Sequence, residues 1–261
     1  MLYPDRANWR LELRRGAWRA HLRFEAPAPS RSALELPEQV ELVGSAVDPG
    51  GAWEASWDYT ADLDPNGNAK LNGSTTIVNK SAQATDFDLS FEVPICPFIQ
   101  NASRMGGACT IKLTADANGG AISTGGGNAV FTALADGAGS NKIFHGPFNM
   151  GTTGSGTAQT ANVFGAPFPA AAAAAVTTDF GVRHVFKLTD GDTALITSNL
   201  VVGGDQANFV ACQQPMQPPA AGAPAAPAAP AAAPAAQPSV GNGPTTSSVT
   251  LGGSSNGKVT I

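Results

Sequence analysis

Side-chain oxygens recur at alternate positions around a glycine in the stretch Ala61-Asp62-Leu63-Asp64-Pro65-Asn66-Gly67-Asn68-Ala69-Lys70. Asp62, Asp64 and Asn66 match the first, third and fifth positions of an EF-hand loop, in which carboxylate and amide oxygens surround a calcium ion. The ninth and twelfth positions carry no carboxylate. The same residues suit a β-turn, since proline presets φ and glycine accepts a positive φ. We interpret the stretch as a hairpin connection, with calcium bound by Asp62, Asp64 and Asn66 as the alternative; we expect no other cofactor.

The thiol chemistry of the chain rests on Cys96, Cys109 and Cys212. None lies in a CxxC pair, and three thiols with three histidines do not match a structural zinc site. Cys96 and Cys109 flank residues 97–108, which we interpret as a loop. In an exported protein we expect a disulfide between Cys96 and Cys109 that closes this loop, with Cys212 free. Three buried free thiols are the alternative.

Patterns for nucleophilic catalysis find little support. The string Gly253-Ser-Ser255-Asn-Gly257 matches GxSxG, but it lies in a Gly/Ser/Thr-rich segment, whereas a nucleophile elbow needs a strand before it and a helix after it. His184 lies between apolar residues of an expected strand, which favours a structural role. We therefore assign no catalytic and no cofactor-binding residue, and expect a protein that is not an enzyme.

Short strands separated by glycine turns must position any site in residues 51–212. Seven runs carry β-branched or aromatic residues, mostly at alternate positions, and Asp-Gly and Asn-Gly turns lie between them. This pattern predicts an all-β fold, an antiparallel β-sandwich of jelly-roll or Ig-like type. The expected strands are Trp53–Tyr59, Ser74–Val78, Phe87–Val93, Cys109–Leu113, Asn128–Leu134, Arg183–Leu188 and Ala194–Ser198.

The N-terminal segment, residues 1–50, is rich in arginine. Its first 31 residues hold seven arginines against three acids, and the runs 9–13 and 18–24 alternate between apolar and polar residues. We predict a β-hairpin with an arginine-bearing face. Upstream sequence captured by a mistaken start codon is the alternative, because the arginines are not followed by the apolar region of a signal peptide.

The C-terminal part differs from the rest in composition. Residues 213–239 form a Pro/Ala-rich tract, which we expect to be a disordered linker extended as polyproline II. Residues 240–261 are rich in Gly, Ser and Thr, and we expect a flexible tail whose weak strands serve attachment or self-association. A disordered tail without a role is the alternative.

Charge argues against nucleic acid as a partner, and hydropathy argues against a membrane-spanning helix. Residues 51–212 hold thirteen acids against seven basic residues, which argues against nucleic acid. No apolar run approaches the roughly 18 residues of a membrane-spanning helix, so we expect no transmembrane segment.

Residues 53–200 resemble a loosely defined group of uncharacterised secreted bacterial proteins, many of which end in a PEP-CTERM sorting tail. The likeness rests on residues 53–59, 76–95, 131–137 and 186–194, which are strand and turn patterns without catalytic residues. The resemblance implies a β-sandwich outside the cell. The sorting tail and a signal peptide are not visible in this chain.

These observations lead to a non-catalytic structural or display module, extracellular or at the cell surface of a bacterium, as the expected function. Its partner would be a component of the surface or of the matrix. A glycan-binding β-sandwich is the alternative, with Trp53, Trp57 and Tyr59 as candidate platforms for sugar rings, although packing in the core explains these residues more simply. An enzyme is a third class.

Overall fold

A computed structural model describes residues 8–14, 17–23, 39–63 and 68–210. The expected linker and tail, and the turn residues 64–67, lie outside this part of the chain. The described residues form strands β1 to β16 and one short 3-10 helix, η1 (Gln206–Asn208), so the prediction of an all-β fold is confirmed. Within them, no helix is long and apolar enough to cross a membrane.

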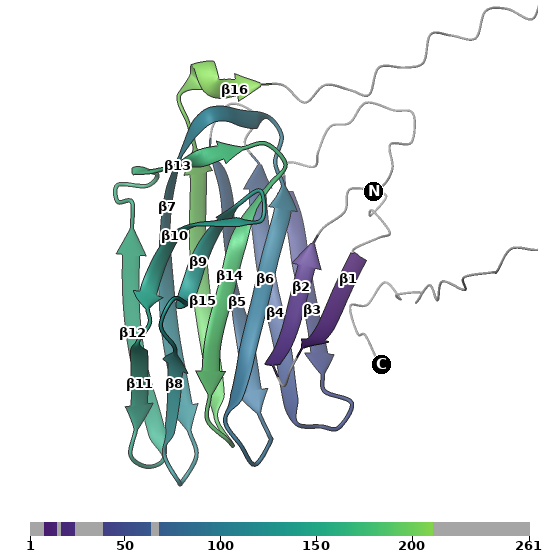
Figure 1. The fold of residues 1–261 in the computed structure, drawn as a ribbon, viewed down its shortest axis with the longest axis vertical. Coiled ribbons are helices and arrows are strands. Elements are labelled where there is room, and N and C mark those ends of the chain that lie inside the picture. The colour runs from purple at the N-terminus through teal and green to yellow at the C-terminus, as the bar shows by residue number, and fades with distance from the viewer. Residues whose placement is uncertain (1–7, 15–16, 24–38, 64–67, 211–261) are drawn as a thin grey trace, which may run out of the picture. The chain divides into compact units, whose positions relative to one another are not determined.

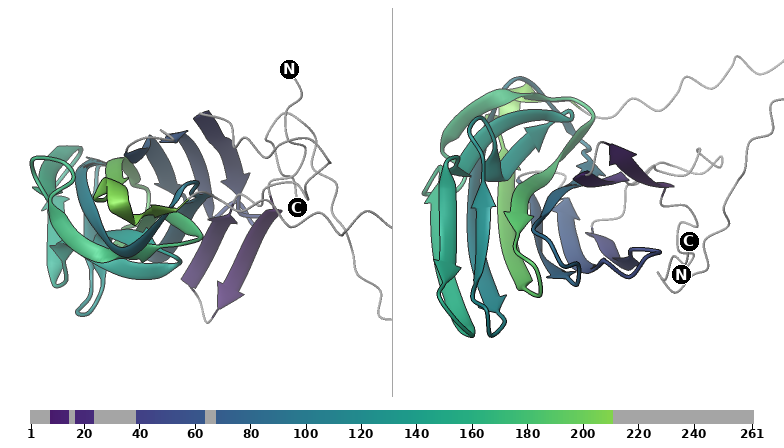
Figure 2. Two further views of the ribbon diagram at one scale, coloured as in Figure 1. Left: turned by 90° about the horizontal axis from the view of Figure 1, so that it is seen from above. Right: turned by 60° about the horizontal axis from the view of Figure 1, so that its bottom comes forward.

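The strands form two sheets that lie face to face (Figures 1 and 2). Pairing in sheet 1 is antiparallel, except that β2 runs parallel to β6. Its strand order is β1 (Asn8–Arg14), β2 (Ala17–Arg23), β6 (Thr85–Pro94), β14 (Asp179–Leu188), β8 (Gly120–Thr124) and β11 (Phe148–Thr152). Strand β9 (Ala129–Ala135) pairs with β14, and β10 (Ala138–His145) pairs with β9.

Sheet 2 is antiparallel throughout its described pairings. Its order is β12 (Gly156–Phe164), β7 (Phe98–Ala115), β15 (Thr193–Gly203), β5 (Ala69–Asn79), β4 (Trp53–Leu63) and β3 (Gln39–Val47). Strands β13 (Ala171–Val176) and β16 (Phe209–Val210) pair with the first part of β7, which bends over one end of the sandwich (Figure 1).

Each of the seven expected strands lies in a strand of the structure, except that Asn128 precedes β9. Of the two runs expected to form the N-terminal hairpin, residues 9–13 and 18–23 pair as β1 and β2, and residue 24 lies outside the described residues. The sandwich also includes β3, which precedes residue 51 and pairs along its length with β4. Strands β4 and β5 pair antiparallel from Trp53 with Asn79 to Leu63 with Ala69, whereas the stretch interpreted as their hairpin connection, residues 64–67, lies outside the described residues.

Aromatic side chains from both sheets fill the space between them. The ring of Tyr59 in sheet 2 stacks on that of Phe91 in sheet 1 with centroids 4.4 Å apart, and the ring of Trp53 meets Phe87 edge to face at 6.3 Å. Such ring pairs contribute about 0.5–1.5 kcal/mol beyond the burial of their apolar area. Because each of these ring pairs joins a side chain of sheet 1 to one of sheet 2, the two sheets share one hydrophobic core.

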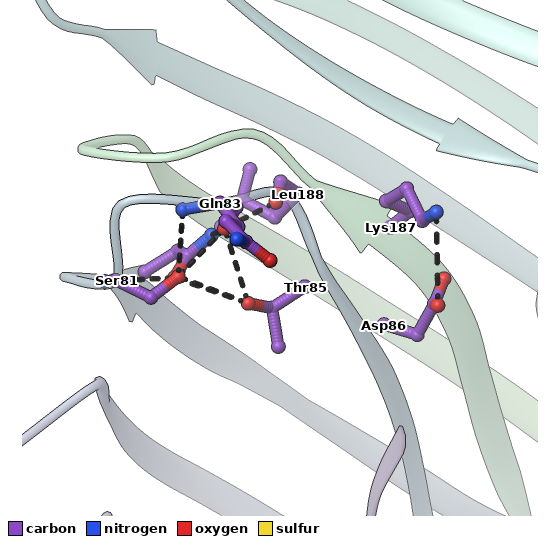
Figure 3. Close-up of polar contacts among 7 residues, drawn as sticks. Ser81, Gln83, Thr85, Asp86, Lys187 and Leu188 are labelled. Atoms are coloured by element: carbon purple, nitrogen blue, oxygen red, sulfur yellow. Dashed lines mark hydrogen bonds and ion pairs between the residues drawn. The ribbon is translucent and has the colours of Figure 1, made fainter. Parts of the chain in front are cut away.

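Polar side chains fasten the turns at the ends of the strands. Asn79 is wholly buried, and its Nδ2 donates to the backbone carbonyls of Gln83, Leu188 and Thr189 at 2.9–3.0 Å. Ser81 donates to Asn79 Oδ1 at 2.7 Å. Figure 3 shows Ser81, Gln83 and the strand ends that they join. This asparagine clasp links the β5–β6 turn to the end of β14.

A second group of polar side chains, the aspartate clasp, fastens the connection between β13 and β14. The carboxylate of Asp136, in the β9–β10 turn, accepts hydrogen bonds from the backbone N–H groups of Thr177, Thr178 and Asp179, at 2.8–3.2 Å. The hydroxyls of Thr177 and Thr178 donate to the same carboxylate. Although partial burial opposes it, this set of donors lowers the pKa of Asp136 below its ordinary value.

Candidate functional site

A shallow open groove of about 530 Å³ lies on the outer face of sheet 2, across the four neighbouring strands β4, β5, β15 and β7. Side chains alternate between the two faces of each strand. Tyr59, Leu71 and Ile111 therefore point into the core, and the residues on either side of them point into the groove or along its face. Since each of the four strands supplies some of the lining residues, the groove exists only once the sheet has formed.

The register of the strands arranges the groove residues in two rows. The first row is Asp58, Ser74, Thr197 and Thr110. The second row is Thr60, Asn72, Asn199 and Ala108. Neighbouring strands lie about 4.8 Å apart and alternate residues about 6.6 Å apart, so the two rows form an array of roughly 14 by 7 Å.

The short side chains of these rows explain why the sheet is hollowed here. Serine, threonine, alanine and asparagine stand lower than Leu195 and Lys112, which occupy the adjacent row on β15 and β7. Below the floor, Gly73 leaves room for the ring of Tyr59: a Cβ at Gly73 would lie 2.5 Å from Tyr59 Cδ1. The close approach requires a glycine, because any side chain would displace the ring.

Hydrogen-bonding capacity remains open inside the groove. Asp58 is exposed, and its carboxylate accepts hydrogen bonds without donating any. The Nδ2 of Asn199 donates to Asn72 Oδ1 across the β15–β5 pair. Within the described part of the chain, the buried Oδ1 of Asn199 accepts no hydrogen bond. A buried amide oxygen without a donor costs about 1–3 kcal/mol, which a ligand hydroxyl can offset if the amide turns toward it.

A buried polar cluster stands directly behind the groove, between the two sheets. The Tyr59 hydroxyl lies 3.2 Å from Thr75 Oγ1 and 3.2 Å from His184 Nε2. Ser198 Oγ lies 3.1 Å from the same nitrogen, and His184 Nδ1 lies 3.1 Å from the carbonyl oxygen of Val130. His184 thus joins sheet 1 to two residues of sheet 2, Tyr59 and Ser198, the structural role that its strand position predicted.

Burial keeps the ionisable members of this cluster neutral. It lowers the pKa of His184 to about 4, although the hydrogen bond to Val130 opposes the change. It raises the pKa of the Tyr59 hydroxyl above its ordinary value and that of the Cys109 thiol to about 12, against the opposing effect of Ser198. The cluster therefore holds the sheets together through neutral hydrogen bonds. The buried thiol of Cys109, which adjoins Ser198, is far from the thiolate form that a nucleophile needs.

The candidate calcium ligands are described only in part. Asp62, at the end of β4, accepts a hydrogen bond from Gln39 Nε2 at 3.2 Å and pairs across the sheet with Lys70. Asp64 and Asn66 lie outside the described residues. Among the residues that the structure does describe, no group of three or more His, Cys, Asp or Glu could hold a metal ion. Calcium binding by this stretch stays a prediction.

The predicted disulfide between Cys96 and Cys109 is wrong. Cys96 is disulfide-bonded, whereas Cys109 is a free thiol that is 1% exposed in the core. The reason is that residues 98–108, expected to form a loop, are part of the continuous strand β7. An extended strand rises about 3.3 Å per residue, so Cys109 lies roughly 35 Å along the chain from the start of β7, while a disulfide requires Cα atoms within about 7 Å.

The candidate sugar platforms are wrong, and the simpler interpretation, core packing, is confirmed. Trp53, Trp57 and Tyr59 share one face of β4, as their spacing indicates, but this is the core face, and all three are buried. The ring of Trp57 lies over Gly44 of β3, where a Cβ would be 2.6 Å from Trp57 Cζ2. These aromatic residues pack the sandwich and cannot contact a ligand at its surface.

The groove itself was not predicted from the sequence. Its signal is a polar residue on each side of a core residue, as in Asp58-Tyr-Thr60, Asn72-Gly-Ser74 and Thr197-Ser-Asn199. Each triplet by itself is an ordinary half-buried strand. Only the pairing of β4, β5 and β15 brings them together. No protein-family model, curated protein or solved structure matches this chain.

Proposed function

We propose that this chain is a non-catalytic module, displayed outside the cell, that binds a glycan in the groove of sheet 2. The observation that carries the proposal is the pair of cross-strand rows, in which seven of eight side chains can donate or accept a hydrogen bond. An open, shallow site across a sheet suits an extended chain that lies flat, such as a short oligosaccharide or a segment of a polysaccharide.

The chemistry of the two rows suits sugar hydroxyls. A carboxylate such as Asp58 accepts hydrogen bonds from two adjacent hydroxyls, and hydrogen bonds to a charged acceptor are about twice as strong as neutral ones. The amides of Asn72 and Asn199 both donate and accept. Ser74 and Thr197 add hydroxyls that rotate to suit a partner. The array therefore matches ligands that carry many hydroxyls on a rigid frame.

Within the sandwich class, we propose a jelly roll rather than an Ig-like fold. The order of strands supports it: β12, β7, β15 and β5 are neighbours in one sheet, and β6, β14, β8 and β11 in the other. The chain passes from one sheet to the other at β2–β3, β5–β6, β6–β7, β7–β8, β11–β12, β13–β14 and β14–β15. Jelly rolls include lectin domains, but a fold by itself does not imply a function, and the groove carries the proposal.

The proposed location is supported by the disulfide at Cys96, because disulfides persist in oxidising compartments and are rare in the cytosol. The resemblance of residues 53–200 to secreted bacterial proteins points the same way.

A glycan array followed by titration calorimetry tests the proposal. Binding should weaken about tenfold in Asp58→Ala, since hydrogen bonds to charged groups contribute about 1.5–3 kcal/mol, and should weaken also in Asn199→Ala. Asp86→Ala is the matched control, because Asp86 is an exposed carboxylate on sheet 1 and pairs with Lys187. Equal affinity of Asp58→Ala and wild type for every bound glycan would exclude the groove.

A purely structural or display module, with a surface or matrix component as partner, is the second candidate. The asparagine and aspartate clasps favour it, since they stiffen turns at the ends of the sandwich without serving the groove. Under this hypothesis the protein retains no glycan on the array, and substitutions in the groove change neither binding nor stability appreciably.

A further inference from the structure

An exposed aromatic ring lies next to the groove. Phe168 is 42% exposed and is the aromatic member of the large exposed hydrophobic residues in the described part of the chain; the others are Val43, Val47 and Val163. It belongs to the connection between β12 and β13, residues 165–170. Burying a phenylalanine ring stabilises a protein by about 1.5–3 kcal/mol, so a ring left in water at this place calls for an explanation.

The contacts of this connection place it on the outer face of sheet 2. A Cβ at Gly106 would lie 2.5 Å from Phe168 Cδ1 and 2.8 Å from the carbonyl oxygen of Gly165, so the ring covers this glycine. A Cβ at Gly203 would lie 3.2 Å from Pro169 Cγ. Gly106 and Gly203 belong to the paired strands β7 and β15. The two glycines thus make room for the connection to lie against the sheet.

Gly106 belongs to the row that follows the second row of the groove. It precedes the groove residue Ala108 by two positions on β7, and its partner Val201 follows Asn199 by two positions on β15. Residues two apart share a face and lie about 6.6 Å from each other. The ring of Phe168 therefore stands over Gly106, in the row next to the second row of the groove and on the side of Ala108.

We propose that Phe168 is the aromatic platform of the groove, and that its ligand is a neutral hexopyranose glycan whose apolar C–H face stacks on this ring. This inference rests on the proposed glycan-binding function. With one sugar ring on Phe168, the neighbouring sugar would lie near the amide of Asn199. Asp58 lies three strands and two rows from Gly106, so only a longer oligosaccharide would also reach its carboxylate. A flat apolar face beside a polar edge is the combination that separates sugars from other hydroxylated ligands.

Charge narrows the ligand class. The residues that line the groove include the carboxylate of Asp58 and no basic side chain. Glu41 on β3 pairs with Thr60 and extends the acidic edge. Like charges repel a bound anion, so the carboxylate of Asp58 disfavours uronic acid polymers and sulfated glycans relative to neutral hexoses. Lys70 and Lys112 lie in the rows that flank the groove, outside the rows that carry Asp58.

The test compares platform variants on the neutral glycan that wild-type protein retains most tightly. Phe168→Ala and Phe168→Leu should each weaken binding about tenfold, because neither side chain has a flat ring, and Phe168→Trp should keep it. Val47→Ala is the matched control, since Val47 is similarly exposed on β3, away from the connection. The Leu and Trp variants decide the question if the Ala variant fails to fold.

The outcomes separate this inference from the proposed function. If Asp58→Ala loses affinity while all Phe168 variants bind within about twofold of wild type, the groove binds glycan and the platform is wrong. If sulfated or uronic acid glycans bind best, the ligand class is wrong. If wild-type protein retains no glycan, the proposed function fails, and the platform fails with it.

Discussion

His184 makes the stability of this protein depend on pH in a window that can be calculated. Its imidazole is wholly buried, and its pKa falls from 6.5 in the unfolded chain to about 4 in the fold. Above pH 6.5 the ring is neutral in both states, and the full stability is present. As the pH falls below 6.5 the unfolded chain takes up a proton that the folded chain refuses, so stability declines until about pH 4.

The size of the loss follows from the two pKa values. A tenfold change in proton affinity corresponds to about 1.4 kcal/mol, so the whole decline from pH 6.5 to 4 amounts to about 3 kcal/mol. About 2 kcal/mol of it is reached at pH 5, where most carboxylates are still ionised. A domain of ordinary stability has about 5–15 kcal/mol in total, and the loss is therefore large enough to measure.

Urea unfolding between pH 7.5 and 5 provides the assay. The free energy of unfolding of wild-type protein should decline over this range, and the decline should vanish in His184→Gln, which keeps a side chain able to hydrogen-bond to Ser198 or Tyr59 but cannot take up a proton. His145→Gln is the matched control, because His145 is exposed. A wild-type free energy that stays constant from pH 7.5 to 5, or an equal slope in His184→Gln, would refute this account of the buried cluster.

Two further predictions concern the clasp and the thiols. Asn79→Ala should lower the free energy of unfolding by about 2 kcal/mol, because it leaves buried carbonyls without a donor; a smaller loss in Ser81→Ala, measured in the same urea titrations, is the control, and equal losses would contradict the central place of Asn79. In protein that is alkylated without reduction, Cys109 should react only after unfolding, since it is buried and its pKa is raised to about 12. Peptide mapping of the same sample should find Cys96 linked, with Cys212 as the remaining cysteine of the sequence; a labelled Cys96 would show that the bond does not form.

The strands were predictable where apolar and polar residues alternate, and not elsewhere. Phe87, Leu89, Phe91 and Val93 share the core face of β6, as their spacing indicates. The first part of β7 gave no such signal, because polar residues are followed by Gly106 and Gly107. Glycine in a strand usually weakens it, but here rings from β12 and the connection after it occupy the space above each glycine. These contacts are distant in sequence, and so the segment resembled a loop.

The candidate site was less predictable than the strands, for two reasons. Alternation shows which residues share a face but not which face is the core, so the aromatic residues of β4 remained candidate sugar platforms even though core packing explained them more simply. The groove, in turn, depends on the register among β4, β5, β15 and β7, which joins residues as far apart as Asp58 and Thr197. One sequence carries no information on such pairings.

Only one sheet separates the groove from the core. Because side chains alternate between the two faces of a strand, one residue lines the groove and the next packs in the core. Asp58, Thr60 and Asn72 can change identity without entering the core, while Tyr59 and Gly73 between them cannot change without disturbing it. Selection can therefore alter ligand preference at the outward positions at little risk to folding. A library randomised at the outward positions alone should yield mostly folded proteins, which makes this face a natural starting point for engineering new binding specificities.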